Sequence, residues 1–360
     1  TQAQKNWNWT RIYNLKYDIT KNLKTDFAAN NIALIGEPRG VINKEDVDWY
    51  EAYKDTVWTN IQNLGETTTY NHNVGVTYKL PLDKFPFINF ISADVRYGGT
   101  FRWDRAPFTQ DTLGNTIQNS RQLQFNTQAN FETFYNAYPR LKQALTGKKA
   151  ETGKKDPKKD DPSKKDGFGD DLTKKKEDKI NPVDVALRFL MMIRSVNGSY
   201  SKNEGMLLPG YANKTKMLGF DNQFDGPGIG FLVGEQNNDL LGNITGRNYA
   251  INAANNGWLV QQSTLNVQYS ETYTETWNLK ANLEPFRYLK IEIAANRQEG
   301  RNYTSFFRFD PLIDDYAFQS PMETGNFSAS VVTWGSAFIK DDKENNYASL
   351  NFDRLIENRY

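Results

Sequence analysis

The chain has 360 residues, a formal net charge of +1, one histidine and no cysteine. These features exclude a disulfide framework and the usual histidine metal clusters, and a near-neutral chain has no overall field to attract nucleic acid. Mean hydropathy is -0.73 and no run of about 18 apolar residues occurs, which excludes a membrane-spanning helix. Composition does not exclude a membrane β-barrel, because the alternation of apolar and polar residues along a strand keeps its average hydropathy low. No signal peptide stands at Thr1, so we expect a removed leader or an internal portion of a longer chain.

Alternating hydrophobicity predicts two opening strands that form a hairpin. The first runs from Trp7 to Ile19, and a turn near Lys21-Asn22 leads into the second, which starts at Leu23. Its outward, apolar parity carries Tyr13, Leu15 and Tyr17. In the connection that follows, apolar residues at helical spacing after Asn43, a candidate N-cap, predict a helix over about 43–64.

The stretch from Thr68 to Trp103 predicts the clearest hairpin, with two long strands and a turn that contains Pro81, Asp83 and Pro86. The apolar parity of the two strands carries Val74, Val76, Tyr78, Ile91 and Val95. Residues of the opposite parity, such as Asn71, Asn73, Asp94 and Arg96, are polar. Long strands with one apolar and one polar face are typical of transmembrane β-hairpins whose apolar face contacts lipid.

Further strands are predicted along the rest of the chain. A loop over Asp104 to Asn119 precedes the fifth strand, which contains Leu123 and Phe125 and leads into a short helix at about 132–145. The sixth strand contains Leu187 to Ile193, and a long Gly/Asn-rich loop at about 203–257 follows it. The seventh strand, Leu265 to Leu283, turns at Glu284, Pro285 and Phe286 into the eighth, which begins at Leu289. Their apolar parity carries Leu279, Ile291 and Ile293. A ninth strand is predicted over Phe327 to Ile339.

The segment 147–180 differs from the strands because it is rich in Lys and Asp and has almost nothing to bury, so we expect it to be disordered. Its lysines could hold lipid A phosphates or anionic cargo, although a solvated spacer is the favoured interpretation. The predicted connections alternate between short turns and long loops, with the one before the ninth strand among the long ones. Outer-membrane barrels show this asymmetry, with short turns in the periplasm. The Lys/Asp segment therefore falls on the periplasmic side.

On most strands the apolar parity meets its first strongly polar residue about one membrane thickness from the short-turn end. The fourth strand is an exception, because its apolar parity continues to Trp103, and Asn89 and Thr25 are polar within the band. At about 3.3 Å per residue and a tilt near 40°, ten residues rise roughly 25 Å, the height of the lipid-facing band of a barrel. The residues predicted at the membrane rim are Arg11, Asn31, His72, Arg121, Ser195, Glu275 and Arg297. A soluble sandwich has no reason to place these residues at one height, so the pattern favours lipid exposure.

Seven ordered stretches resemble the SprA/Sov family, the outer-membrane translocon of the Bacteroidetes type IX secretion system. The first contains Pro81, Asp83 and Pro86, and the second begins with Gly114 and Asn115 and includes Asn119. The others are 206–210 with Pro209 and Gly210, 226–234 with Gly226, Pro227, Gly228, Gly230 and Gly234, 283–286 with Glu284, Pro285 and Phe286, 307–311 with Asp310 and Pro311, and 334–338 with Gly335. The pieces are weak singly and gain specificity from their order.

The resemblance implies an internal arc of a very large single-chain barrel of about 36 strands, with a protein-sized pore. It also implies a lateral opening toward a PorV-type partner barrel, a periplasmic plug protein and folded cargo carrying a type IX signal. Many family members support gliding motility as well. Neither a cofactor nor bond chemistry is expected, and nucleic acid is not an expected partner.

Other interpretations of single motifs are weaker. The run from Gly226 to Gly234 lacks the Gly-Lys-Ser/Thr ending of a phosphate loop, which favours an irregular, closely packed loop. Solvated loop acids are favoured over a Ca²⁺ site for Asp221, Asp225, Asp310, Asp314 and Asp315. His72 could act as a general base, but no nucleophile pattern accompanies it. For the whole chain, the alternatives are another large outer-membrane barrel, such as a transporter or usher, and a soluble extracellular β-protein that binds glycans.

Overall fold

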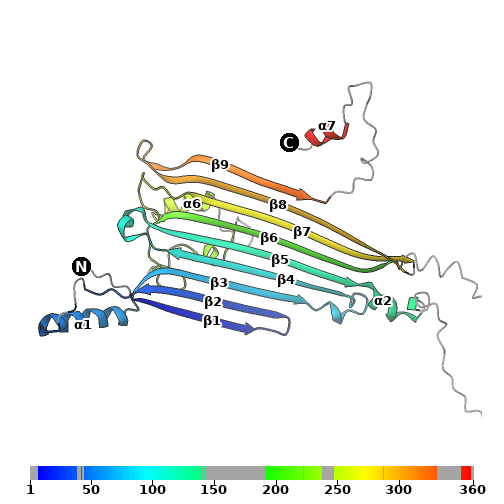
Figure 1. Cartoon of the computed structure of the whole chain (residues 1–360), viewed down its shortest axis with the longest axis horizontal. Helices are drawn as coiled ribbons and strands as arrows, with labels where there is room; N and C mark the ends of the chain where they lie inside the picture. Colours follow the sequence, from blue (N-terminus) through cyan, green and yellow to red (C-terminus); the bar gives the residue numbers. More distant parts are fainter. Residues whose placement is uncertain are drawn as a thin grey trace, which may run out of the picture.

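The computed structural model describes residues 7–38, 42, 44–139, 141–142, 191–221, 223–236, 247–286, 288–330 and 350–357. Nine strands form one antiparallel sheet whose spatial order follows the chain order, so neighbouring strands are also consecutive in sequence (Figure 1). The strands are β1 (Asn8–Asp18), β2 (Leu23–Leu34), β3 (Glu66–Leu80), β4 (Ile91–Asp104), β5 (Asn115–Asn130), β6 (Ile193–Tyr211), β7 (Tyr269–Phe286), β8 (Leu289–Asp310) and β9 (Asp315–Ala329). This confirms the predicted all-β fold of long antiparallel strands with short helical inserts.

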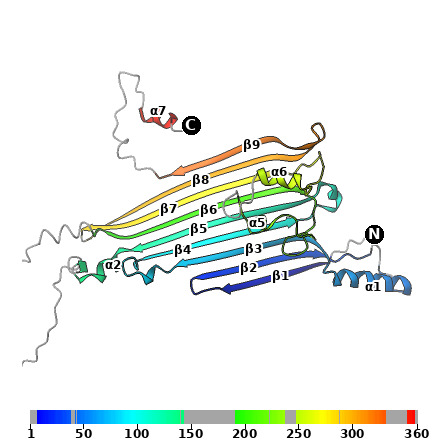
Figure 2. The ribbon, with the colours of Figure 1, turned by 180° about the vertical axis from the view of Figure 1, so that it is seen from behind.

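Short helices lie in the connections at the two ends of the sheet. α1 (Val47–Gln62) and α6 (Arg247–Asn255) lie at the end where β2 leads into β3 and β6 into β7, whereas α2 (Phe131–Ala137) lies at the short-turn end (Figures 1 and 2). The remaining helices are η1 (Leu82–Lys84), η2 (Phe108–Leu113), α5 (Ile229–Leu232) and α7 (Leu350–Glu357). Of the helices described, none has the length and apolar character required to cross a membrane.

Several strands begin or end at other residues than predicted. β5 already begins at Asn115, and β6 continues to Tyr211, so residues 203–211 belong to a strand and not to the predicted long loop. Asn, Ser and Gly in these stretches resemble loop signals, but Ser120, Asn203 and Gly205 occupy the polar face of their strands and Asn119 is buried on the other face. β7 begins only at Tyr269, four residues after the predicted start at Leu265.

The last hairpin differs most from the prediction. β9 starts at Asp315, directly after a short turn over 311–314, so the connection before the ninth strand is not long. The turn is stabilised by the Asp310 carboxylate, which accepts a hydrogen bond from the Leu312 backbone N–H at 2.9 Å, beside a Pro that favours turns. The predicted strand 327–339 therefore only overlaps the end of β9, and Gly335 lies outside the described residues.

The helices also differ in detail from the expectation. The N-cap of α1 is Asp46 and not Asn43, because the Asp46 carboxylate accepts a hydrogen bond from the Trp49 N–H at 3.1 Å. α2 ends at Ala137, and Asn130 caps its start. Residues 139 and 141–142 are again helical, and the predicted end at residue 145 lies outside the described residues. The Lys/Asp segment 147–180 and Leu187 and Phe189 of the predicted sixth strand lie outside the described residues.

The hydrophobic core lies on one face of the sheet, at the end away from the short turns. We call residues 212–236 together with α6 the covering segment, because they pack over this end. Large side chains of β3 to β6 meet Phe231 and Leu232 of α5 and Tyr249 of α6. The residues that β3 to β6 contribute to this core include Tyr70, Phe101, Trp103, Ile117, Met206 and Leu208. They share the parity of the apolar residues that precede them on each strand, so one face carries both the core and the exposed apolar residues.

Candidate functional site

The apolar face carries an exposed band between the short turns and the covering segment. The strand register brings together the residues predicted to contact lipid, for example Tyr78 beside Val95 and Ile293 beside Ala281. Leu15 is 64% exposed and Ile293 is 53% exposed, and no second layer covers them in the part of the chain that the structure describes. We call this surface the apolar band; its predicted members are Tyr13, Leu15, Tyr17, Val74, Val76, Tyr78, Ile91, Val95, Leu279, Ile291 and Ile293.

Six of the residues predicted at the membrane rim form one oblique line on the apolar face. Arg11 on β1 pairs with Asn31 on β2, and Asn31 pairs with Tyr70 on β3. His72 is two residues beyond Tyr70, so it lies two residues nearer the short-turn end than Asn31 does. The next polar residue again lies two positions nearer the short-turn end on passing from β3 to β5, from β5 to β7 and from β7 to β8. We call the oblique line through these residues the polar line. It runs through Arg11, Asn31, His72, Arg121, Glu275 and Arg297.

The slope of the polar line gives a strand tilt. Four shifts of two residues occur over the seven strand spacings from β1 to β8. With about 3.3 Å per residue and about 4.8 Å between strands, strands that cross a level polar line are tilted by about 40° from its normal. Strands of outer-membrane barrels are tilted by about 35–45°. The polar line and the barrel geometry are therefore mutually consistent.

One predicted rim residue does not lie on the polar line. Ser195 pairs with Asn130 and Asn282, both near the short-turn end. β6 begins only at Ile193, whereas the predicted strand already contained Leu187, so the count of residues from the short-turn end misplaced Ser195. On β6 the line passes instead beside Lys202 and Glu204, which pair with Glu275 and Tyr273.

The covering segment buries the central part of the polar line. Asn31, His72 and Arg121 are buried, so these residues do not end in water as a bare membrane rim would. His72 uses both ring nitrogens: Nε2 lies 2.7 Å from the Leu232 carbonyl oxygen and Nδ1 lies 3.1 Å from the Tyr70 hydroxyl. A buried ring with two such partners supports packing and not general-base catalysis.

Backbone carbonyls of the covering segment are bound by polar side chains of the sheet. Tyr97 donates its hydroxyl to the Val233 carbonyl at 2.8 Å, and Asn119 donates to the Phe231 and Glu235 carbonyls at 3.2 and 3.3 Å. Gln236 donates in turn to the Asn119 side-chain oxygen at 2.7 Å. Burial raises the pKa of the Tyr249 phenol well above its ordinary value, which keeps it protonated and able to donate to the Pro227 carbonyl at 2.7 Å. The segment is therefore anchored by satisfied, buried hydrogen bonds.

The motif positions of the sequence analysis cluster at two places. Gly226, Pro227, Gly228, Gly230 and Gly234 belong to the covering segment, which fits the expected irregular, closely packed loop. Gly114 and Gly210 both have positive φ and meet at the same end of the sheet: a Cβ atom on Gly114 would lie 2.9 Å from the Gly210 carbonyl carbon. Beside them, Pro209 of β6 pairs with Thr116 of β5, and Asn115 of β5 pairs with Tyr211 of β6. The turn motifs lie at strand ends and comprise Pro81, Asp83, Pro86, Glu284, Pro285, Phe286, Asp310 and Pro311.

The acidic residues considered for Ca²⁺ do not assemble into a metal site. Asp221 organises its own loop, since it accepts hydrogen bonds from the Asn213 side chain at 2.9 Å and from two backbone N–H groups of residues 223 and 225. Asp310, Asp314 and Asp315 lie at the β8–β9 turn. Within the described ranges, no group of three or more His, Cys, Asp or Glu residues could hold a metal ion.

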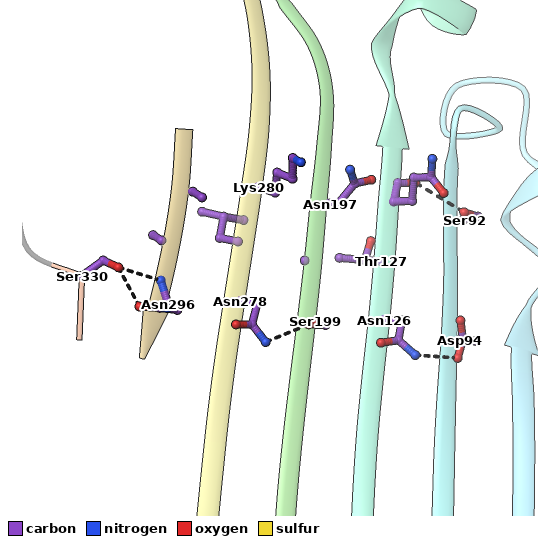
Figure 3. A pocket seen from close by; sticks show the side chains of 15 residues that line it. Ser92, Asp94, Asn126, Thr127, Asn197, Ser199, Asn278, Lys280, Asn296 and Ser330 are labelled. Carbon is purple, nitrogen blue, oxygen red and sulfur yellow. Dashed lines mark hydrogen bonds between the residues drawn. The ribbon is translucent and has the colours of Figure 1, made fainter. Parts of the chain in front are cut away.

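The opposite, polar face carries a shallow groove of about 620 Å³ that crosses β4 to β8 (Figure 3). Its side chains are mostly amides and hydroxyls that bond across strands, such as Asn126 to Asp94 at 3.0 Å and Asn278 to Ser199 at 3.3 Å. On β5 every polar-face residue is uncharged: Thr116, Gln118, Ser120, Gln122, Gln124, Asn126 and Gln128. Such a surface stays hydrated along its whole length.

No protein-family model matches the chain, and no curated protein matches it significantly. The functional assignment therefore rests on the contrast between the apolar band and the polar face.

Proposed function

We propose that this chain forms an arc of a large outer-membrane β-barrel that conducts proteins, as its resemblance to the type IX translocon implies. The observation that carries the proposal is the apolar band, which ends at a polar line whose slope corresponds to a strand tilt of about 40°. Aromatic side chains supply the girdles of such a band, with Tyr200 against Trp277 near the polar line and Phe87 and Phe286 exposed near the short turns.

In this proposal the polar face lines the lumen and the function is performed by shape. Uncharged amides and hydroxyls keep the wall hydrated, while most charged residues on this face are paired, such as Arg102 with Asp104 at 2.6 Å. A hydrated wall with few unpaired charges offers a passing folded protein little to adhere to. No step of bond chemistry is required.

The two edges of the sheet require further strands. β1 and β9 each have a neighbour on one side only, and an unpaired strand edge is not tolerated in lipid. We therefore infer that additional strands complete the barrel, outside the nine described. A lateral partner barrel, a periplasmic plug and exported cargo are the partners that the resemblance adds.

Membrane placement can be tested with single thiols, because the chain has no cysteine. Leu15→Cys and Ile293→Cys lie in the apolar band, and Lys16→Cys and Glu292→Cys are their neighbours on the opposite face. In the full-length protein reconstituted in vesicles, we expect spin-labelled lipid to quench a fluorophore on the first pair and not on the second. Equal quenching at all four positions, or release of the full-length protein from membranes by carbonate, would favour the soluble glycan-binding alternative.

The transport role has a separate test. Depletion of the full-length protein should cause folded cargo with a type IX signal to accumulate in the periplasm. Normal export during depletion would overturn this role while leaving the barrel intact, and a transporter or usher would then be the better assignment.

A further inference from the structure

We propose that a cleft between β6 to β9 and α6 binds the phosphorylated headgroup of an outer-leaflet glycolipid. The inference rests on the proposed function, because it places the apolar band in the membrane and the polar line at headgroup depth. The short turns are periplasmic in that arrangement, so the α6 end of the sheet faces the outer leaflet (Figure 2).

The cleft has a volume of about 700 Å³ and opens on the apolar face. It begins beside the polar line, where Lys202 pairs in register with Glu275. Its cationic and aromatic lining consists of Lys202, Arg247, Arg301, Tyr273 and Tyr303. A lipid whose acyl chains lie on the apolar band would thus bring its headgroup to this lining.

The arginines near the cleft are oriented by acids that lie deeper in the sheet. Glu299 is 18% exposed and accepts hydrogen bonds from Arg301 Nε and from an Arg297 terminal nitrogen, each at 2.9 Å. The carboxylate fixes one edge of each guanidinium group. Arg297 and Arg301 are 47% and 75% exposed, so a phosphate can reach their remaining N–H donors.

Arg247 reaches the cleft from α6. Its guanidinium group stacks over the Tyr303 ring at 4.5 Å, and its nitrogens lie 4.0 Å from the carboxylates of Glu271 and Glu323. A separation of 4.0 Å is too long for a hydrogen bond, so the ring holds the guanidinium plane while its donors can bind a ligand.

The acids that line the cleft do not cancel this preference. Glu204 is bound by Arg121 at 2.5 Å and by Lys202 at 3.0 Å, and Glu271 accepts the Tyr269 hydroxyl at 2.6 Å. These two carboxylates face protein donors, whereas Arg247 and Arg301 face the open side of the cleft. The third acid of the lining, Glu323, is 71% exposed and lies 4.0 Å from Arg247. Apart from Glu323, the surface offered to a headgroup is guanidinium and aromatic.

Co-purification tests this inference. The full-length protein is extracted from outer membranes with detergent, and the bound phosphorylated glycolipid is quantified by mass spectrometry. We expect the double variant Arg247→Gln/Arg301→Gln to retain about tenfold less lipid, because two charge-assisted contacts are lost. The control is Arg96→Gln/Arg102→Gln, which removes two arginines of similar exposure from the polar face and should retain normal amounts.

A second arm separates lipid from free phosphate. Delipidated protein is titrated with the phosphorylated glycolipid, its dephosphorylated form and inorganic phosphate. We expect tight binding only of the phosphorylated lipid, with little competition by inorganic phosphate. Equal binding of both lipid forms, or equal lipid retention by both double variants, would overturn the inference while the protein still required detergent for extraction. Extraction without detergent would instead refute the membrane placement itself.

Discussion

Gly99 on β4 and Gly234 in the covering segment bring their backbones into direct contact. A Cβ atom on Gly234 would lie 2.8 Å from the Gly99 Cα, and a Cβ atom on Gly99 would lie 1.8 Å from the Val233 carbonyl oxygen. Gly234 also has a φ of 84°, which side-chain-bearing residues rarely adopt. This pair of glycines therefore determines how closely the covering segment approaches the sheet.

We expect Gly99→Ala to displace the covering segment, because the new methyl group meets backbone that cannot move independently. Overpacking of this kind costs about 1–3 kcal/mol. Hydrogen exchange of residues 229–236 in the detergent-solubilised full-length protein should rise. The matched control is Gly98→Ala, where the nearest atom to the new Cβ lies at an ordinary 3.8 Å. If both variants exchange alike, the close contact does not position the segment.

Asn119→Ala should loosen the same segment by a different mechanism. The Asn119 side chain is fully buried and bonds the Phe231 and Glu235 carbonyls and the Gln236 amide, so its loss leaves buried groups unsatisfied. The expected cost is about 1–3 kcal/mol, seen as faster exchange at residues 231–236. Asn126→Ala removes an amide of the open polar face that bonds Asp94, and it should change stability by less than about 0.5 kcal/mol. Comparable losses in the two variants would argue against the anchoring role.

Most of the fold could be predicted from the alternation of apolar and polar residues along the strands. The parities of Val74, Val95 and Ile293 are correct because side chains on a strand repeat every two residues, and this signal is local. The strand ends were less predictable, because Asn203 and Gly205 on the polar face of β6 have the composition of a loop. The short β8–β9 turn was missed because its Asp and Pro residues also occur in long loops.

The covering segment could not be placed from the sequence. Its anchoring contacts join residues more than a hundred positions apart, such as Asn119 with Gln236 and His72 with Leu232, and no period records such a pairing. The sequence therefore identified His72 and Arg121 as the first polar residues on the apolar face of their strands. It could not show that these side chains are buried by protein and do not contact lipid headgroups. The glycine-rich run from Gly226 to Gly234 indicated close packing, but it did not indicate that the partner is Gly99 on β4.

The buried ion pair between Arg121 and Glu204 should be sensitive to removal of one partner. Its atoms lie 2.5 Å apart and both side chains are almost fully buried. We expect Glu204→Gln to destabilise the protein by about 3–5 kcal/mol, because it removes one of the two charges of a buried ion pair. Thermal unfolding in detergent measures the change. Glu292→Gln breaks the exposed pair with Lys280 and should cost about 0–1 kcal/mol, and equal losses would contradict this interpretation.

If the apolar band contacts lipid, the free-energy cost of an introduced arginine depends on its depth in the band. Leu279 lies in the middle of the band, Asn278 is its neighbour on the polar face, and Trp277 lies next to the polar line. We expect Leu279→Arg to cost about 2–4 kcal/mol in the membrane, because a charge at mid-depth loses its hydration, whereas Trp277→Arg should cost about 0–1 kcal/mol. Asn278→Arg should have little effect, since its side chain faces water.

The measurement is the fraction of full-length protein that reaches the outer membrane in a folded, heat-modifiable form. We expect a graded result, with Leu279→Arg lowest, Trp277→Arg intermediate and Asn278→Arg near the parent. Such a gradient requires that one face of the sheet contacts a medium whose polarity changes with depth, as a membrane does. A soluble sheet would respond to loss of packing alone, and Leu279, which is already half exposed, would then tolerate arginine as well as Asn278 does.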